Sequence, residues 1–401
     1  MSQPKPAQDW DPLSPEYVED PRAVWQRLHA SCPVAYSDQF GGFWALFKHA
    51  DIEQAAGDIA TFSSAERFSI PSFSIDGVEW RPLQSDPPEH GQFRQVIRPL
   101  FQASRLKTFE APLRAMTNEL IDKFIDRGQA DLAAELCIPL PAAALCLLLG
   151  RPLDDWTMLK EWAVRMIDTG RMGDLDGLVA VYGEMMGYAE QWKKEVAAKG
   201  TAAEGDGQDL MMRMLSAGIE GRGMTDSEIA GMFVLTITAG HETTANTLAN
   251  AMHYLAANPS ARRYLTGDPA RIPRAVEELI RFCSPTQHLA RTTTREVAIG
   301  GRTIPAGQPV ALMWTAGNMD GEKYENPDTC DFARDARGNL TFGSGIHRCV
   351  GEFLARMEIR IVLEEFLRRI PDFELDGPGE PAGWNSIGFY RLPARFTAQL
   401  G

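Results

Sequence analysis

The sequence reads Phe342-Gly343-Ser344-Gly345-Ile346-His347-Arg348-Cys349-Val350-Gly351 immediately before a long helical pattern, so three glycines and one cysteine fall within ten residues. Apolar side chains then recur at helical spacing from Val350 to Ile361, which predicts that Cys349 lies at or near a helix N-terminus. Unpaired backbone N–H groups and the helix dipole favour a thiolate over a thiol at such a position. Gly343 and Gly345 allow the preceding loop to turn tightly and to lie close to a flat partner.

Two other interpretations of Cys349 are open from the residues alone. One is a buried structural cysteine beside a turn. The other is a cysteine nucleophile with His347 as its base. This second interpretation is disfavoured, because two residues of separation at a loop–helix junction give poor geometry and no orienting acid stands nearby.

The whole stretch resembles the cysteine loop of the cytochrome P450 family, Phe-Gly-x-Gly-x-His-x-Cys-x-Gly, at every fixed position. The resemblance implies that Cys349 is the axial thiolate of a haem iron, with haem b as the cofactor, and that Phe342, Gly343 and His347 belong to the same site. Such a thiolate pushes electron density onto the iron and favours O–O cleavage.

Composition narrows the class of protein and its partners. The chain has 401 residues, a formal net charge of −14, and six cysteines. The cysteines lie far apart with no CxxC pair, which disfavours a disulfide scaffold or a zinc site. The acidic charge argues against nucleic acid as a partner. The first residues lack an apolar core, and the longest apolar run, residues 137–150, contains two prolines and is too short to span a bilayer. We therefore expect a cytoplasmic protein with no membrane segment.

Helical patterns dominate the chain and strand-like segments are few. Residues 1–20 are polar and proline-rich, which predicts an extended surface arm, and a short hairpin is expected over 33–47, where Gly41-Gly42 falls. Further helices are expected at 20–30, 51–59, 88–101, 107–127, 139–149, 154–170, 175–198, 226–257, 260–265, 271–282 and 350–369, and strands at 296–304, 309–313 and 389–400. The pattern predicts a mainly α chain with a small β region. Its order of elements resembles the P450 family, which implies one large helical domain over residues 1–401.

The longest expected helix contains a local defect. It starts at the capping box Thr225-Asp226-Ser227-Glu228, and nothing breaks it before Asn258-Pro259. A glycine inside a helix lowers the stability of the helix by up to about 1 kcal/mol relative to alanine. The presence of Gly240 therefore indicates that a side chain is excluded at this position. The hydroxyl of Thr243 is expected to bond the carbonyl of Ala239 four residues back. Taken alone, these residues are also compatible with close helix packing at Gly240 and a solvent-facing Glu242.

The segment Ala239-Gly240-His241-Glu242-Thr243-Thr244 resembles the oxygen-binding segment of the same family. The resemblance implies that Ala239 and Gly240 make room for O2 beside the cofactor. It also implies that Thr243 and Glu242 are the catalytic residues that manage protons. His241 is expected to pack or lie on the surface.

Two further stretches resemble the family's haem cradle. Glu278 and Arg281 stand at i and i+3 on one helix face, where they are expected to form a structural pair. The stretch Asp86-Pro87-Pro88-Glu89-His90-Gly91-Gln92-Phe93-Arg94 resembles Asp-Pro-Pro-x-His-x-x-x-Arg. Haem propionates need cationic, hydrogen-bonding partners, and the resemblance implies that these are His90, Arg94, Arg291 and His347. One departure is Met319, where many relatives carry arginine, and its expected effect is a looser local ion pair.

The resemblance also implies which segments line the substrate pocket and where electrons arrive. The expected pocket residues are Phe68, Phe73, Phe233, Thr236, Gln287, His288, Ile387 and Phe389. They are mostly apolar, which suits a small or medium hydrophobic molecule. The chain has no reductase portion, so a ferredoxin-type electron donor is expected. Arg348, Arg356 and Arg360 are candidates for a basic docking patch, alongside the plainer interpretation as a solvated arginine face.

These features predict a haem-thiolate monooxygenase that inserts one oxygen atom from O2 into a hydrophobic organic substrate, with electrons from NAD(P)H through a reductase and the ferredoxin. A haem-thiolate peroxygenase or isomerase is the first alternative. The intact Glu242-Thr243 pair speaks against it, because such relatives usually alter that pair. A non-catalytic haem-based sensor is the second. The substrate, the ferredoxin and the oligomeric state do not follow from the residues.

Overall fold

The structure is a computed structural model that describes residues 6–72, 78–172, 174–199, 209–381 and 386–397. The chain divides into two compact units. The first, called the sheet unit here, comprises Met1–Ser74, Leu83–Pro87 and Glu278–Cys349. The second, called the helical unit, comprises Ile75–Pro82, Pro88–Glu277 and Val350–Gly401.

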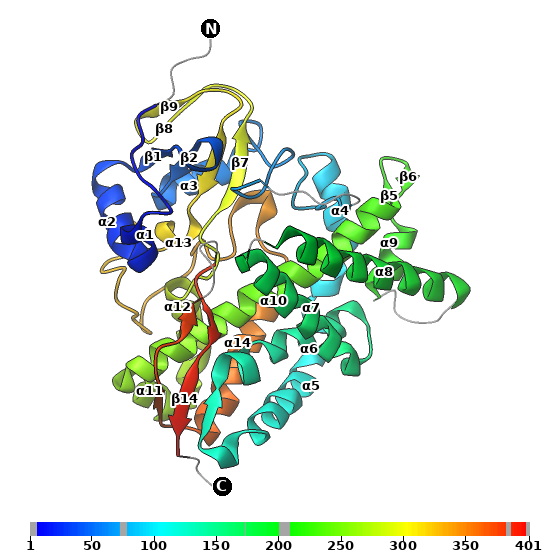
Figure 1. The fold of residues 1–401 in the computed structure, drawn as a ribbon, viewed down its shortest axis with the longest axis vertical. Helices are drawn as coiled ribbons and strands as arrows, with labels where there is room; N and C mark the ends of the chain where they lie inside the picture. The colour runs from blue at the N-terminus through cyan, green and yellow to red at the C-terminus, as the bar shows by residue number, and fades with distance from the viewer. Residues whose placement is uncertain (1–5, 73–77, 173, 200–208, 382–385, 398–401) are drawn as a thin grey trace. The chain divides into compact units, whose positions relative to one another are not determined.

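The sheet unit is built on a five-stranded sheet in the order β1-β2-β10-β7-β3 (Figure 1). Its strands are β1 Val34–Ser37, β2 Phe43–Leu46, β3 Phe62–Ser63, β7 Leu289–Thr293 and β10 Pro309–Leu312. The pairs are antiparallel except for β2 with β10, which run parallel. The expected hairpin over 33–47 is confirmed as β1 and β2, with Tyr36 opposite Trp44. A second hairpin joins β8 Val297–Ile299 to β9 Arg302–Ile304.

Short helices accompany this sheet: α1 Pro15–Glu19, α2 Pro21–Ser31, α3 His49–Gly57 and α13 Trp314–Gly317. Aromatic and branched side chains from the strands and from α3 form its core, which is the packing that β-rich segments favour. The core includes Val34, Tyr36, Trp44, Leu46, Ile52, Phe62, Val310, Leu312, Trp314 and Leu340.

The extended N-terminal arm expected from the sequence is corrected over the described residues. Trp10 is buried and meets the rings of Phe43 and Phe47 edge-on at 5.9 and 5.2 Å. Tyr17, on α1, is buried as well. The expectation rested on the polar and proline-rich composition of the segment and did not take Trp10 and Tyr17 into account. Their large apolar rings are buried and hold the segment in the sheet unit.

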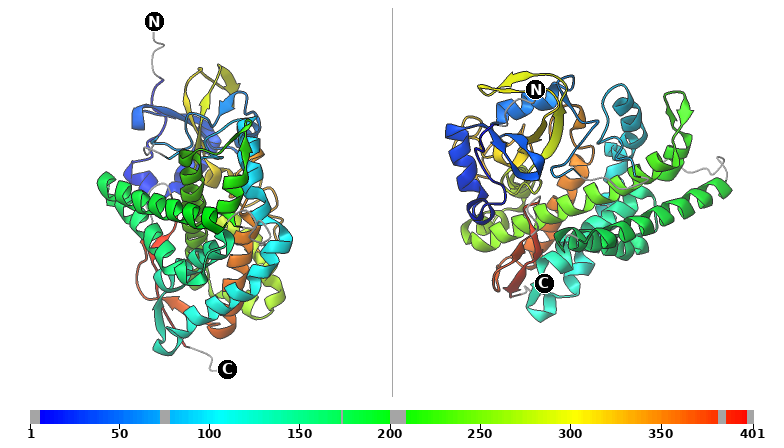
Figure 2. Two further views of the ribbon diagram at one scale, coloured as in Figure 1. Left: turned by 90° about the vertical axis from the view of Figure 1, so that its right-hand side faces the viewer. Right: turned by 45° about the horizontal axis from the view of Figure 1, so that its top comes forward.

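The helical unit contains most of the helices. Their bounds are α4 Glu89–Ile97, α5 Ala103–Asp122, α6 Pro139–Leu149, α7 Trp156–Met172, α8 Leu175–Lys199, α9 Leu210–Ser216, α10 Asp226–Ala257, α11 Pro259–Thr266 and α14 Glu352–Arg369. Helix α12, Ile272–Phe282, ends in the sheet unit, because the division falls between Glu277 and Glu278. The views in Figure 2 show α8 beside α10, and α14 in orange beside α5 in cyan.

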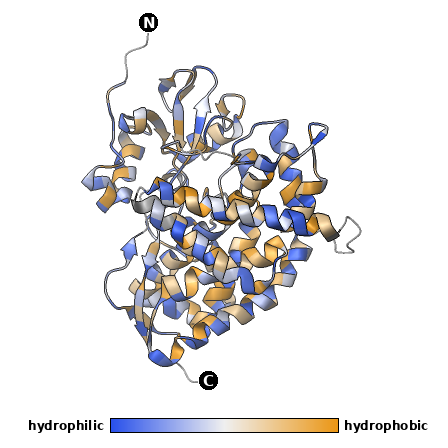
Figure 3. Cartoon of the chain, turned by 45° about the vertical axis from the view of Figure 1, so that its right-hand side comes forward, coloured by the Kyte–Doolittle hydropathy of each residue, from blue (hydrophilic) through white to orange (hydrophobic). Residues whose placement is uncertain are grey.

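Short β elements complete the helical unit. A three-stranded sheet has the order β11-β14-β4, from Phe373–Leu375, Pro393–Phe396 and Gln129–Asp131. Two hairpins pair β5 Gly218–Ile219 with β6 Arg222–Gly223, and β12 Glu380–Pro381 with β13 Phe389–Arg391. Figure 3 shows hydrophilic and hydrophobic residues alternating along the helices, as expected for helices with one buried face. The predicted class, mainly α with a small β region, is confirmed.

Candidate functional site

The cysteine loop is held by its own backbone. The N–H of Cys349 donates to the carbonyl of Phe342 at 2.8 Å, which closes the loop on itself. Gly345 has φ +69°, and a Cβ there would lie 2.3 Å from the carbonyl oxygen of Ala56 at the end of α3, so only glycine fits. The side chain of Cys349 is exposed, and the residue stands three positions before the first residue of α14. The loop therefore presents this thiol rather than burying it.

Phe342 and His347 lie in the same loop and are half-buried. Gly343 has φ +69°, and a Cβ there would reach the ring of Trp314 at 4.0 Å. The space beside the backbone of Gly343 is thus bounded by the ring of Trp314, while the loop itself remains accessible.

The pair Glu278 and Arg281 forms as predicted and is completely buried. Arg281 Nε and Nη2 donate to the Glu278 carboxylate at 2.9 and 2.7 Å. Arg281 also donates to the carbonyls of Asn318 at 2.7 Å and Pro327 at 3.0 Å. This bidentate pair therefore fixes the segment that precedes the cysteine loop.

Arg334 is a member of this cluster that the sequence analysis missed. Its Nε donates to Glu278 Oε1 at 3.1 Å, and its Nη1 and Nη2 groups donate to backbone carbonyls of the same segment. No pattern in the sequence around Arg334 indicates this role, because its partner Glu278 lies 56 residues away in the sequence. The buried carboxylate thus has two guanidinium partners.

Met319 does not loosen the cluster, contrary to the expectation. Its side chain is buried, and its sulfur lies 3.8 Å from Arg281 Nη1. The Glu278–Arg281 pair keeps its short bidentate contacts. A thioether is a weak acceptor that fills space, so it packs against the guanidinium without competing for it.

We expect Glu278→Ala to destabilise the protein strongly, because it leaves two guanidinium groups buried without their carboxylate. Breaking a buried pair in this way costs about 3–5 kcal/mol. The neighbouring Glu277 provides a matched control, since it is partly exposed and pairs with Arg356 at 2.7 Å. Glu277→Ala should cost at most about 1 kcal/mol. Urea unfolding of both variants checks the difference, and equal midpoints would contradict it.

Arg291 is a buried cation on β7. Its side chain is 1% exposed, and its guanidinium donates to the carbonyl of Ala290 at 2.7 Å. Burial lowers the pKa of Arg291 to about 10, while the charge of Asp86 opposes this shift. Asp86 itself accepts hydrogen bonds from Ser63 Oγ and from the backbone of Ser64. Among the described residues no carboxylate lies within ion-pair distance of Arg291, so its charge favours an anionic partner.

His90 and Arg94 lie one turn apart on α4, as predicted. His90 is buried and Arg94 is half-buried. They belong to the helical unit, whereas Arg291 and His347 belong to the sheet unit.

Helix α10 follows the predicted bounds and begins with the predicted capping box, in which Thr225 and Glu228 bond each other's backbone. One face of its middle turns is accessible although most of the helix is buried. The residues on this face are Leu235, Thr238, Ala239, Glu242 and Thr243. Leu235 and Thr238 were missed by the sequence analysis, and their spacing from Ala239 and Glu242 is the signal that could have found them.

Within this face, Ala239 is exposed and Thr243 Oγ1 donates to its carbonyl at 2.9 Å, as expected. Gly240 lies against α6. A Cβ there would lie 2.8 Å from Cδ2 of Leu145 on α6. The missing side chain of Gly240 therefore allows close packing of two helices, which was the alternative interpretation of this glycine.

His241 points into the helical unit. It is buried, and its Nε2 lies 2.9 Å from the carbonyl of Ile138. Burial lowers the pKa of His241 to about 4, so the ring is neutral at physiological pH. The expectation of a packing role is supported.

Glu242 has polar but uncharged neighbours. Burial raises the pKa of its carboxyl, and the polar side chains of Ser386 and Asn246 act in the opposite direction. Tyr182 of α8 is close enough that the Glu242 charge raises its pKa further. This carboxyl therefore holds its proton more readily than an exposed glutamate does.

Two expected pocket residues on α10 are buried. Phe233 stacks on Tyr188 with centroids 5.9 Å apart and meets Trp192 at 6.0 Å. It lies on the side of α10 opposite the accessible face and packs between helices. Thr236 lies seven residues before Thr243 and so on nearly the same side of the helix. Its hydroxyl donates to Met232 at 2.7 Å, and its place in the pocket stays a prediction.

The expected pocket residues of the sheet unit are tied into its framework. Gln287 is buried and accepts a hydrogen bond from Tyr17 at 2.6 Å. His288 is buried, with Nε2 3.3 Å from the carbonyl of Ile70, and burial lowers its pKa to about 4. The carbonyl of Phe68, which is half-buried, accepts from Ala290 at 2.8 Å. Gln287 and His288 thus join segments together, and Phe73 lies outside the described residues.

On the turn before β13, Ile387 is half-buried and its carbonyl accepts from Asn250 at 2.8 Å. Phe389 stacks on His253 at 4.6 Å. His253 stands eleven residues after Glu242, roughly 16 Å further along α10. The ring of Phe389 therefore packs on α10 about three turns after Glu242, and its expected place in the pocket stays a prediction.

The arginines expected to form a docking patch carry partners of their own. Arg356 pairs with Glu277 at 2.7 Å and Glu352 at 2.9 Å. Arg360 pairs with Glu110 at 3.0 Å and Glu364 at 3.1 Å. These carboxylates cancel most of the positive charge, which corrects the expectation of a basic patch at these two residues.

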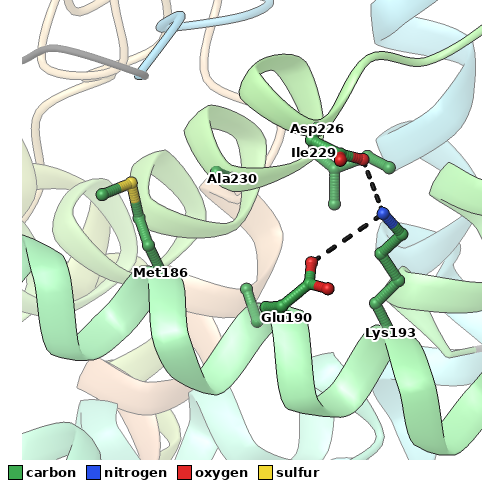
Figure 4. Close-up of a pocket in the computed structure, with 7 residues that line it drawn as sticks. Met186, Glu190, Lys193, Asp226, Ile229 and Ala230 are labelled. Atoms are coloured by element: carbon green, nitrogen blue, oxygen red, sulfur yellow. Dashed lines mark hydrogen bonds and ion pairs between the residues drawn. The ribbon is translucent and has the colours of Figure 1, made fainter.

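The two helices α8 and α10 also border a small pocket (Figure 4). Lys193 crosses it and lies 2.6 Å from Asp226 and 3.8 Å from Glu190. Met186, Ile229 and Ala230 line the rest. The ion pairs satisfy the charges of this pocket, so it is a seam between helices and not the functional site.

Two features are absent from the described residues. No cluster of three metal-binding side chains from histidine, cysteine, aspartate or glutamate occurs among them. Within the same residues, no helix is both long and apolar enough to cross a membrane.

Known proteins match both the sequence and the fold. The family model for cytochrome P450 matches residues 176–268 and 272–381. Cytochrome P450 130 of Mycobacterium tuberculosis is 36% identical over 346 residues, covering 83% of each chain. The erythromycin C-12 hydroxylase of Saccharopolyspora erythraea is 32% identical over 352 residues, covering 86% of each chain. The structure of cytochrome P450 CYP109Q5 from Chondromyces apiculatus matches with a TM-score of 0.86 at 26% identity, covering 98% of this chain and 99% of that one.

These matches extend over most of the chain at levels that establish common descent. They include a named hydroxylase, and they agree with the cysteine loop and the long helix described above. The chain therefore belongs to the cytochrome P450 family of haem-thiolate monooxygenases, among its bacterial members.

Proposed function

We propose that this protein inserts one oxygen atom of O2 into a small or medium hydrophobic molecule, with haem b as cofactor and electrons from NAD(P)H through a reductase and a ferredoxin. The observation that carries the proposal is the exposed thiol of Cys349 at the end of a loop that its own backbone closes. A loop of this kind provides one sulfur ligand for a haem iron and no second protein ligand.

The described residues fit a haem. Cys349 would supply the thiolate ligand, and Arg291 would supply a buried cation that lacks a carboxylate partner among the described residues. A buried charge of this kind is costly unless an anion accompanies it, and a propionate is such an anion. His90, Arg94 and His347 are the other propionate partners in this proposal. When bound, the haem supplies the iron at which O2 is activated, and its thiolate ligand favours O–O cleavage.

The accessible face of α10 supports the proton chemistry. Thr243 donates its hydroxyl proton to Ala239, so its oxygen offers lone pairs that orient a water molecule. Glu242 has a raised pKa and stands next to Thr243, so it holds and passes a proton. Leu235 and Ala239 leave the same face apolar on either side, which supports a hydrophobic substrate.

Electron delivery needs a partner surface that does not depend on a large basic patch. Arg356 and Arg360 are paired with carboxylates, so long-range steering from them is weak. We infer that the ferredoxin docks through shape and short-range contacts.

Turnover with defined electron sources tests the function. Compounds are first screened for a low-spin to high-spin shift of the haem. We expect any strong hit to yield an oxygenated product that requires NADH, reductase, ferredoxin and O2 together. Product from hydrogen peroxide alone, with none from the NADH system, would favour the peroxygenase alternative. Spin-shifting compounds that cause neither NADH consumption nor product would favour a sensor.

A further inference from the structure

The accessible face of α10 stops one turn before Leu235. At about 100° per residue, Gly231 lies within about 40° of Leu235, Thr238 and Glu242, so all four share one side of the helix. Leu235 is half-buried, whereas Gly231 is buried. Because a glycine has no side chain, its burial means that another segment of the chain covers the helix at this point.

The segment that covers Gly231 is a tight turn at residues 78–82. A Cβ on Gly231 would lie 1.9 Å from the carbonyl oxygen of Glu79, 2.6 Å from its carbonyl carbon and 2.8 Å from its nitrogen. Contacts with backbone atoms cannot be relieved by the rotation of a side chain, so the turn reaches α10 only because residue 231 is glycine. Gly231 and the turn both belong to the helical unit.

The turn is also held by contacts away from α10. The N–H of Arg81 donates to the carbonyl of Glu79 at 2.7 Å, which closes a three-residue turn. The Arg81 guanidinium lies 3.3 Å from the carboxylate of Glu79 and 3.5 Å from that of Glu89 on α4. It also lies 5.8 Å from the centre of the Phe93 ring on the same helix. Helix α4 therefore holds the turn independently of α10.

Trp80, at the centre of the turn, extends the cover from α10 to α8. Its side chain is buried, and its ring meets that of Tyr182 on α8 edge-on, with centroids 5.8 Å apart and an interplanar angle of 87°. Helix α8 lies beside α10 (Figure 2). One short turn thus contacts both helices at the N-terminal limit of the accessible face, and its largest side chain fills the space on the α8 side.

We propose that the turn at residues 78–82 is the end wall of the substrate site, and that Trp80 sets the length of substrate that the site accepts. The inference rests on the proposed function, because it takes the accessible face of α10 as the surface along which the hydrophobic substrate lies. Gly231 and Thr243 are twelve residues apart, roughly 18 Å along the helix. A molecule that reacts near Thr243 can extend along α10 by at most this distance before it meets the turn.

A series of n-alkylbenzenes of increasing chain length tests the end wall. Binding to the haem-loaded protein is measured by calorimetry and by the low-spin to high-spin shift. In the wild type, each added CH2 group should lower Kd by about fourfold until the chain reaches the wall, after which Kd should rise. Trp80→Ala removes the indole ring, so its best-bound member should have a longer chain, with about fourfold in Kd gained for each CH2 group that the wild type excludes. Trp80→Phe keeps an aromatic ring and should move the limit less.

Gly231→Ala tests the contact with α10 while Trp80 stays in place. The added methyl group displaces the turn from the helix, so this variant should also bind longer members than the wild type does. Gly187→Ala is the matched control, because Gly187 lies inside α8 and a Cβ there would meet nothing within 4 Å. This control should keep the wild-type limit. The thiolate band of the reduced carbon monoxide complex checks that each variant is folded.

The outcomes separate this inference from the proposed function. A best-bound member that stays the same in Trp80→Ala, or a shift of equal size in Gly187→Ala, would overturn the end wall even if the wild type forms product. If no member of the series bound the wild type, the inference would also fail. If the limit moved as expected but no member gave an oxygenated product with NADH, reductase, ferredoxin and O2, the proposed function would fail and the end wall would stand.

Discussion

Cys349→Ala will lose the red-shifted Soret band of the reduced carbon monoxide complex, and product formation will fall to background. The thiolate is the proposed axial ligand, and alanine offers no donor in its place. Three buried cysteines cannot substitute as thiolates. Burial raises the pKa of Cys146 and of Cys283 to about 12 and raises that of Cys137 as well, so these remain thiols. Absorption spectra of the reduced carbon monoxide complex measure the result.

Cys146→Ala is the matched control for this experiment. It removes a sulfur from the buried face of α6 and should keep the band at its wild-type position, although deletion of a buried atom lowers stability somewhat. A red-shifted band that survives in Cys349→Ala would mean that the ligand assignment is wrong.

Thr243→Val and Glu242→Gln should both impair turnover, but in different ways. Valine keeps the shape of threonine and removes the oxygen that orients water, so Thr243→Val should still consume NADH while releasing hydrogen peroxide in place of product. Glu242→Gln removes the proton donor, so the whole cycle should slow and its solvent isotope effect should grow. Acid–base assistance of this kind is worth about 10²–10⁴-fold. NADH consumed, product formed and peroxide released are measured for each variant.

Thr236→Val provides a control on the same helix. Thr236 also donates its hydroxyl to a carbonyl four residues back, yet it is buried and lies about two turns before Thr243 on α10. Its replacement should leave the ratio of product to NADH near the wild-type value. If Thr243→Val kept that ratio as well, the proposed transfer of protons through Glu242 and Thr243 would be incorrect. The accessible face of α10 would then serve substrate binding alone.

The features that the sequence determined by itself are those set by near neighbours in the chain. The capping box and the bounds of α10 follow from residues within one turn. The bond from Thr243 to Ala239 and the pair of Glu278 with Arg281 span four and three residues. Helical periodicity and these short spacings were sufficient to predict such contacts, and the cysteine loop was identified because its glycines and cysteine fall within ten residues.

Other features were decided by tertiary structure, because they join residues far apart in the sequence. Gly240 packs on Leu145, and Arg334 completes the buried cluster around Glu278. Periodicity marked Phe233 as apolar but not which face it occupies, since apolar side chains surround much of α10.

The pairing of charged side chains and the position of the C-terminal turn could not be predicted from the sequence for the same reason. The sequence predicted a basic patch from the arginines near α14. In the structure, however, Arg360 pairs with Glu110 on α5 and with Glu364 on its own helix. Gly388, in the turn before β13, lies against Asn246 of α10 although the two are far apart in the sequence. Residue type and spacing carry no information on which distant groups will share a site; that depends on how the helices pack, and only packing brings the C-terminal turn onto α10.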